Sequence, residues 1–183
     1  MKTPFKISDS LSLPLDAVTQ KFAFLGRTGS GKTYTAMKLA EEMISANAQV
    51  IALDGIGIWH GLRTAADGKS KGLSIPIFGG EFGDIPINAG SGELLAELLV
   101  TKGISAIIDV SNFRKGERKT FMVAFAEHLF HLKKKHKSAV HIFIEESQMF
   151  IPQRTIKGEE RMLGAMEDLC KLGRNYGIGI SLI

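Results

Sequence analysis

The chain contains Gly26-Arg27-Thr28-Gly29-Ser30-Gly31-Lys32-Thr33, which matches the phosphate-binding loop pattern G-x-x-x-x-G-K-[ST] at every position. A short apolar run, Phe22-Ala23-Phe24-Leu25, precedes the loop as a buried strand would. After the loop, apolar residues recur at helical spacing at Ala36, Met37, Ala40, Met43 and Ile44. Strand, glycine loop and helix follow one another in the order that phosphate binding requires.

The residue types of this loop suit a cluster of anionic phosphates. Glycines let successive backbone N–H groups curl around the phosphates, and the following helix N-terminus favours negative charge. Lys32 would reach the β- and γ-phosphates, and the Thr33 hydroxyl would bind Mg²⁺. The sequence therefore predicts a nucleoside triphosphate site made of Gly26, Arg27, Thr28, Gly29, Ser30, Gly31, Lys32, Thr33 and Tyr34.

The composition is that of one globular domain. The chain has 183 residues, 44% of them hydrophobic, and a single cysteine, Cys170, which excludes an internal disulfide. Cys170 falls on the apolar side of a helical pattern and is interpreted as a core residue. No run approaches the ~20 apolar residues of a membrane span, so we expect a cytoplasmic protein without a membrane partner. The net charge of +4 permits a polyanionic partner without requiring one.

Strand and helix patterns alternate along the chain. Buried strands are expected at 49–54, 104–110, 140–144 and 177–183, and helices at 93–101, 117–133 and 158–172. This alternation predicts an α/β fold, a mostly parallel sheet with helices on both faces. Residues 1–20 read as an N-terminal strand region, an edge strand or hairpin, and residues 55–92 as an insertion with a little β structure. The last strand is apolar to Ile183, so we expect residues 1–183 to be a single domain that is cut inside its own fold.

The second half of the active site is expected where a strand ends in an acid. Asp54, Asp109 and Glu145 all occupy such positions, but only Glu145 is followed by a second acid, Glu146. Adjacent carboxylates can divide the work, one facing the metal and the next activating the attacking water. Glu145 is therefore the predicted metal-side acid and Glu146 the catalytic base. Asp109 is a weaker rival, because Val110 stands where the base should be, and Asp54 is a candidate for the surroundings of the site.

Trp59, the only tryptophan, lies at the start of the expected insertion. Two interpretations remain open from the sequence. Its ring packs under the loop, or it stacks on an adenine base or a partner.

Together these motifs resemble a known family. The loop GRTGSGKT, the later IFIEESQMFIPQ, and LGRNYGIGISLI after a helix are similar to the HerA–FtsK superfamily of P-loop ATPases, closest to its HerA-like branch. Asp54-Gly55 resembles the family's acid–turn element, and residues 173–177 its Gly-Arg-x-x-Gly element. Two features depart from the family: Glu145 stands where Asp is usual, and the chain stops at Ile183, where a polar sensor residue is due.

The resemblance implies a fold, an activity and partners. It implies a Mg²⁺-dependent ATPase that works as a homo-hexamer on double-stranded DNA, and it leaves a nuclease or other effector protein open as a partner. It also implies an arginine supplied by a neighbouring subunit, for which Arg174 is the first candidate and Arg161 the second. A surface arginine bonding helix-end carbonyls is the plainer alternative for Arg174. The basic loop Lys133–Lys137 would either contact DNA phosphates or simply be solvated.

Two other functions remain open beside the DNA motor. A protein-secretion or packaging motor would share the same core, and a nucleotide-gated regulatory module would hydrolyse ATP slowly and recruit a partner. A small-molecule kinase is disfavoured, since there is no arginine-rich lid in the sequence.

Overall fold

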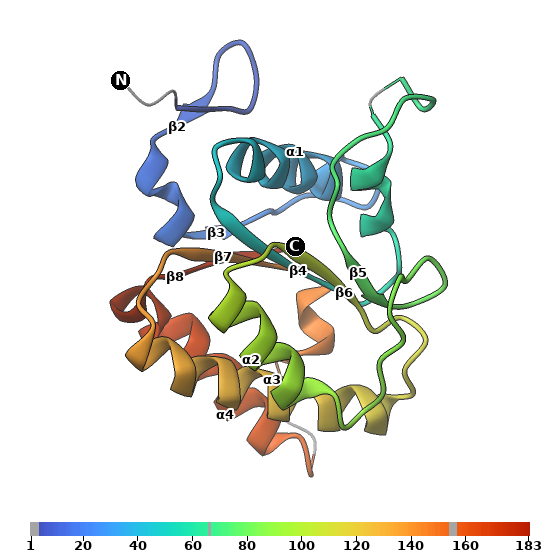
Figure 1. The fold of residues 1–183 in the computed structure, drawn as a ribbon, viewed down its shortest axis with the longest axis vertical. Helices are drawn as coiled ribbons and strands as arrows, with labels where there is room; N and C mark the ends of the chain where they lie inside the picture. The colour runs from blue at the N-terminus through green and yellow to red at the C-terminus, as the bar shows by residue number, and fades with distance from the viewer. Residues whose placement is uncertain (1–3, 66, 154–156) are drawn as a thin grey trace.

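A computed structural model describes residues 4–65, 67–153 and 157–183 of the chain. Its centre is a six-stranded, entirely parallel sheet with the order β3-β8-β7-β4-β6-β5 (Figure 1). The strands are β3 (Lys21–Ala23), β4 (Gln49–Asp54), β5 (Ile77–Gly79), β6 (Ala106–Asp109), β7 (Val140–Ile144) and β8 (Ile178–Leu182). The predicted α/β fold is confirmed, and β8 lies between the strand before the phosphate-binding loop and the strand before Glu145.

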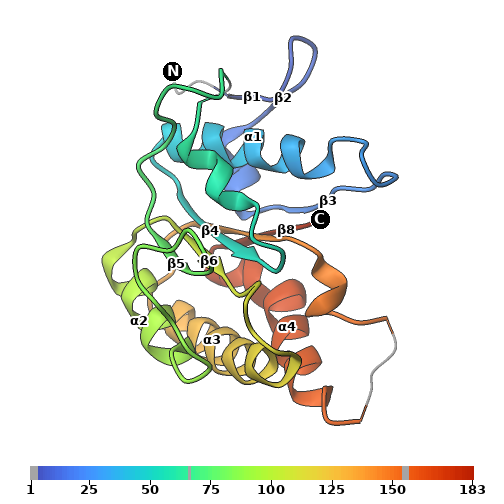
Figure 2. The same cartoon turned by 90° about the vertical axis from the view of Figure 1, so that its right-hand side faces the viewer.

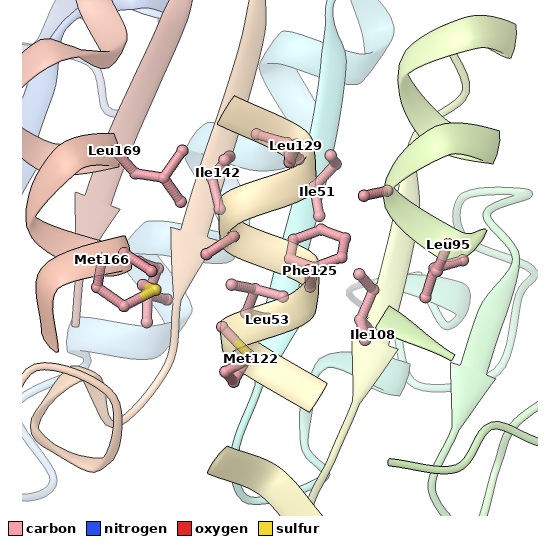
Figure 3. Packing of buried hydrophobic residues seen from close by; sticks show 14 of the residues in the cluster. Ile51, Leu53, Leu95, Ile108, Met122, Phe125, Leu129, Ile142, Met166 and Leu169 are labelled. Carbon is pink, nitrogen blue, oxygen red and sulfur yellow. The ribbon is translucent and has the colours of Figure 1, made fainter. Parts of the chain in front are cut away.

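Helices cover both faces of this sheet. Helix α1 (Lys32–Ser45) lies on one face, and α2 (Gly92–Lys102), α3 (Lys115–Lys135) and α4 (Glu160–Leu172) lie on the other (Figures 1 and 2). Side chains of a strand point alternately to the two faces, so Ile51 and Leu53 pack under α3 while Val50 and Ala52 pack under α1. Figure 3 shows the larger apolar layer, in which Phe125 and Leu129 of α3 cover the sheet.

The N-terminal region is the hairpin that the sequence allowed. Strands β1 (Phe5–Lys6) and β2 (Ser12–Leu13) pair antiparallel as a separate two-stranded sheet, and a short helix η1 (Leu15–Thr19) leads into β3. The strand predicted before the loop is present as β3, but it begins one residue earlier and ends two residues earlier than the apolar run 22–25, and its side chains are not buried. Strand β3 ends at Ala23 and pairs only with β8 in the described sheet, and the Leu25 side chain is 89% exposed.

The segment from Gly55 to Gly92 is more than an insertion. It contains the short helix η2 (Trp59–Arg63) and β5, which extends the main sheet in parallel with β6. The Arg63 guanidinium forms a pair with Asp84 that joins the start of this segment to its end. The little β structure expected there therefore belongs to the central sheet.

The expected basic loop at Lys133–Lys137 was also wrong in part. Lys133 to Lys135 form the last turn of α3, and the Lys133 side chain is fully buried. Its ammonium donates hydrogen bonds to the carbonyl and hydroxyl oxygens of Ser138. Burial lowers the pKa of Lys133 to about 8. Lys133 therefore fixes the connection from α3 to β7 and is closed to DNA.

His141 of β7 joins three elements on the α1 face of the sheet. Its Nδ1 lies 2.8 Å from the carbonyl oxygen of Val18 in η1, and its Nε2 lies 2.7 Å from the Ser181 hydroxyl of β8. A carbonyl can only accept, so Nδ1 carries the proton and Nε2 accepts from Ser181 in the neutral ring. Burial lowers the pKa of His141 to about 4.

Because His141 is buried as the neutral ring, we expect the protein to be less stable in mild acid. The unfolded chain takes up a proton near the ordinary histidine pKa, and the folded chain does so only near pH 4. The contribution of His141 to the free energy of unfolding is therefore fully present above about pH 6.5. It falls by roughly 3 kcal/mol as the pH drops to about 4. Urea unfolding across this range should show a shallower pH dependence for His141→Gln. The matched variant His131→Gln, at an exposed position of α3, should keep the wild-type dependence; equal slopes for all three proteins would contradict this assignment.

Candidate nucleotide and magnesium site

The phosphate-binding loop connects β3 to the first turn of α1, and two of its glycines have a left-handed backbone. Gly29 has φ 77° and Gly31 has φ 86°, a left-handed conformation that side chains other than glycine rarely adopt. A Cβ at either residue would meet nothing within 4 Å, so the backbone conformation, rather than packing, is what calls for glycine. Gly31 directly precedes α1, so the free N–H groups and the positive end of the dipole of this helix lie where the loop ends.

Lys32 and Ser30 both contact one carbonyl of the loop. The Lys32 ammonium lies 3.4 Å from the carbonyl oxygen of Arg27, across the loop. The Ser30 N–H donates to the same carbonyl at 3.1 Å, which closes the turn. Tyr34, one residue past Thr33, is 72% exposed and beside a shallow hollow that Met37 and Thr64 also line. The predicted loop residues therefore lie together between β3 and the first turn of α1, and Tyr34 faces a separate hollow on the side of that helix.

Glu145 meets this loop directly. It follows β7 in the same alternation as His141 and Phe143, and so faces α1. The Thr33 hydroxyl donates a hydrogen bond of 2.8 Å to Glu145 Oε1. Thr33 and Glu145 are 112 residues apart, and the fold brings both predicted metal-side groups together.

These two oxygen-bearing side chains fit Mg²⁺. Magnesium usually takes one or two protein oxygens, with water and substrate phosphates filling its octahedron. Within the described ranges, no group of three or more histidine, cysteine or carboxylate side chains could hold a metal ion. A magnesium ion here would therefore be held by Thr33 and Glu145 together with nucleotide phosphates and water.

The Glu145 carboxyl is almost completely buried. Burial raises its pKa, and the hydrogen bonds from Thr33 and Trp59 act in the opposite direction. Those two bonds use one oxygen each, so both carboxyl oxygens have a partner. A nearby cation would add to the stabilisation of the charged form.

Glu146 has a different environment. It has φ 51° and ψ 53°, one of only two non-glycine residues with positive φ among those described. This turn ends β7 and leads into the short helix η3 (Ser147–Met149). Glu146 is partly exposed, and Gln148 donates a hydrogen bond from its amide to the Glu146 carboxylate. The two adjacent acids are thus divided, one buried against Thr33 and one at the surface of the site.

Asp54 and Trp59 form the wall behind Glu145. Asp54 is fully buried, and its carboxylate accepts hydrogen bonds from the backbone N–H groups of Ile56, Gly57 and Trp59 at 3.0, 2.8 and 2.7 Å. The Trp59 ring is fully buried and packs on Phe143, so it lies under the loop and is not open to an adenine base. Its indole N–H donates to Glu145 Oε2 at 3.0 Å. Sequence reasoning missed this contact, for which no motif gives a signal.

Asp109 lies elsewhere. It ends β6, which β4 separates from β7, and its carboxylate accepts a hydrogen bond of 2.9 Å from the Ser111 N–H. Gly80 packs directly against this carboxylate, where a Cβ would clash. The structure therefore places Asp109 in a turn beside β5 and not against Thr33.

The two arginine candidates are apart from the loop. Arg174 is exposed in the short helix η4 (Gly173–Tyr176), which precedes β8, whereas the phosphate-binding loop follows β3. Since β3 and β8 are parallel neighbours, Arg174 and the loop lie at opposite ends of the strands. Arg161, in the first turn of α4, binds Glu127 of α3 through two hydrogen bonds of 2.8 and 2.7 Å.

Comparison with known proteins bears on the identity of this site. A family model described as Helicase HerA, central domain, matches residues 6–73, which include the phosphate-binding loop, α1 and β4. The resemblance to the HerA–FtsK superfamily is confirmed. The HerA-like match ends before β5, so the acids Glu145 and Glu146 lie outside the matched part.

Several solved structures are similar to the chain, and one of them is a conjugation coupling protein. The conjugation coupling protein TcpA of pCW3, in its monomer form with ATPγS, is 15% identical with a TM-score of 0.47. The alignment covers 94% of this chain and 44% of that one, so the chain spans less than half of its length. No curated protein matches the chain. Among the helices described, none has the length and apolar character needed to cross a membrane.

Proposed function

We propose that this chain is the ATP-binding and ATP-hydrolysing subunit of a ring-shaped HerA-like motor that translocates double-stranded DNA. The contact of 2.8 Å between Thr33 and Glu145 carries the enzymatic part of the proposal. It joins the two motifs that must meet for Mg²⁺-ATP to be held in one place. The HerA-like match over residues 6–73 supports the choice of motor family.

In the proposed reaction each residue has one task. The loop N–H groups and Lys32 hold the β- and γ-phosphates, and Thr33 and Glu145 hold the metal side of the nucleotide. Bound Mg²⁺ supplies positive charge that neutralises the phosphate oxygens. Glu146, on the open side of the turn after β7, accepts the proton of the water that attacks the γ-phosphate.

A ring also explains where Arg174 lies. A head-to-tail ring brings one surface of each subunit against a different surface of the next. Arg174 and the phosphate-binding loop are at opposite ends of the strands, so Arg174 cannot serve its own loop but suits the loop of a neighbour. We propose a homo-hexamer of this kind, with Arg174 acting between subunits. Arg161 remains the second candidate, although its guanidinium is already paired with Glu127.

The proposed DNA partner is tested by its effect on turnover. We expect double-stranded DNA to raise the ATPase rate, and added salt to weaken this effect, because phosphate contacts release counterions. ATP turnover would be measured with and without duplex at two salt concentrations. Lys32→Ala is the control for contaminating ATPase: it removes a charge-assisted phosphate contact, so its ATP affinity should fall on the order of 10- to 100-fold.

Other outcomes identify the alternatives. If the rate of ATP turnover is the same with and without duplex DNA, the result would contradict the DNA motor and favour a protein-secretion or packaging motor. Tight ATP binding with very slow turnover, with or without DNA, would favour a nucleotide-gated regulatory module.

A further inference from the structure

Trp59 connects two strand ends at the base of the proposed magnesium site. Its indole Nε1 donates to Glu145 Oε2 at 3.0 Å, while the other oxygen, Oε1, accepts from Thr33 at 2.8 Å. The ring is fully buried and lies 5.3 Å from the Phe143 ring, centroid to centroid. The carboxylate is therefore held between a threonine on α1 and a tryptophan on η2.

The backbone at Trp59 is held in place by Asp54. Asp54, the last residue of β4, accepts three backbone hydrogen bonds from the turn that follows, and the shortest, 2.7 Å, comes from the Trp59 N–H. Strands β4 and β7 are hydrogen-bonded neighbours, with Leu53 beside Ile144. The turn after β4 thus fixes the tryptophan beside the residue that ends β7.

We propose that Trp59 is a positioning residue for the metal-side carboxylate of Glu145. A glutamate side chain has three rotatable bonds, and a carboxylate held at only one oxygen can still swing about the last of them. The indole N–H occupies the second oxygen and leaves the first directed at Thr33. An indole N–H is a donor only and cannot bind a metal, so Trp59 acts through Glu145. This inference rests on the proposed ATPase function.

The test is Trp59→Phe, which keeps a large ring and deletes the N–H. A hydrogen bond to a charged group contributes about 1.5–3 kcal/mol, so the Mg²⁺ concentration for half-maximal turnover should rise on the order of 10- to 100-fold. The affinity for Mg²⁺ should fall by the same factor when Mg²⁺ is titrated calorimetrically onto protein loaded with ATPγS. Nucleotide affinity measured in EDTA should stay at the wild-type value.

Two comparisons separate positioning from simple loss of packing. Val50→Ala creates a cavity in the same apolar cluster, on β4, but does not touch Glu145; it should lower the melting temperature and leave the Mg²⁺ requirement unchanged. In a Glu145→Gln background, Trp59→Phe should add no further rise. A Trp59→Phe protein with the wild-type Mg²⁺ requirement, or a Val50→Ala protein with the same rise, would overturn the proposal.

The wild-type protein provides a second measurement that needs no change at Trp59. Because the chain has one tryptophan, tryptophan fluorescence reports only on the surroundings of Trp59. Addition of Mg²⁺ to the ATPγS complex should change the emission in wild type and not in Glu145→Gln. Constant wild-type emission at saturating Mg²⁺ would also overturn the proposal. Failure to bind ATPγS at all would instead contradict the proposed function, so the two failures are distinguishable.

Discussion

Replacing Glu146 with glutamine should leave ATP bound and lower its hydrolysis on the order of 10²- to 10⁴-fold, the usual contribution of a positioned base. Glutamine keeps the shape of the side chain but cannot accept the proton of the attacking water. Glu146 takes no part in the hydrogen bond between Thr33 and Glu145, so nucleotide and metal binding should survive. Single-turnover hydrolysis and equilibrium ATP affinity together would show this division.

The matched control is Asp109→Asn, the same acid-to-amide change at the other candidate. Asp109 lies in the turn next to Gly80 and Ser111 and does not contact Thr33 or Glu145, so its variant should keep turnover within a few-fold of wild type. Loss of turnover in Asp109→Asn with normal turnover in Glu146→Gln would reverse the assignment of the base.

Arg174→Ala should keep ATP affinity and lose turnover on the order of 10³- to 10⁵-fold, the range of an arginine supplied to a phosphoryl transition state. The structure rules out action within one subunit, because Arg174 precedes β8 at the end of the strands opposite the loop. Under the proposed ring, this loss would report an arginine supplied by a neighbouring subunit. Arg161→Ala, which removes the pair with Glu127, serves as the comparison at the second candidate.

Mixed rings test the transfer between subunits. An Arg174→Ala subunit keeps its own Glu146 and can use the arginine of a neighbouring Glu146→Gln subunit. Mixing the two inactive proteins should therefore restore part of the ATPase rate. If subunit exchange is demonstrated and no activity returns, Arg174 has no role between subunits. The position of Arg174 would then no longer argue for the proposed ring.

Much of the fold was predictable because a parallel sheet is buried on both faces. The apolar runs at residues 49–54 and 140–144 stand out from their surroundings and coincide with β4 and β7. The loop from Gly26 to Thr33 was predictable because phosphate binding constrains consecutive residues, and the acid pair because a strand end places them. Their catalytic roles stay predictions.

The remainder depends on contacts between distant residues. Trp59 and Glu145, which are hydrogen-bonded, are 86 positions apart in the sequence, and no sequence pattern links a tryptophan to a glutamate at that distance. Lys133 belongs by its sequence to a basic run, and only the folded chain shows that it is buried with its ammonium bonded to Ser138. Strand β5 has three residues, too few for a periodic signal, and Leu25 is exposed because the described β3 ends before it.

The left-handed backbone at Glu146 sets thermal stability against activity. A residue with a Cβ in that conformation costs on the order of 1 kcal/mol, which glycine or asparagine would largely relieve. Either replacement would also remove the proposed base. A screen that rewards heat resistance would therefore favour inactive protein at this position, and a raised melting temperature there would mark an enzyme that has lost its chemistry.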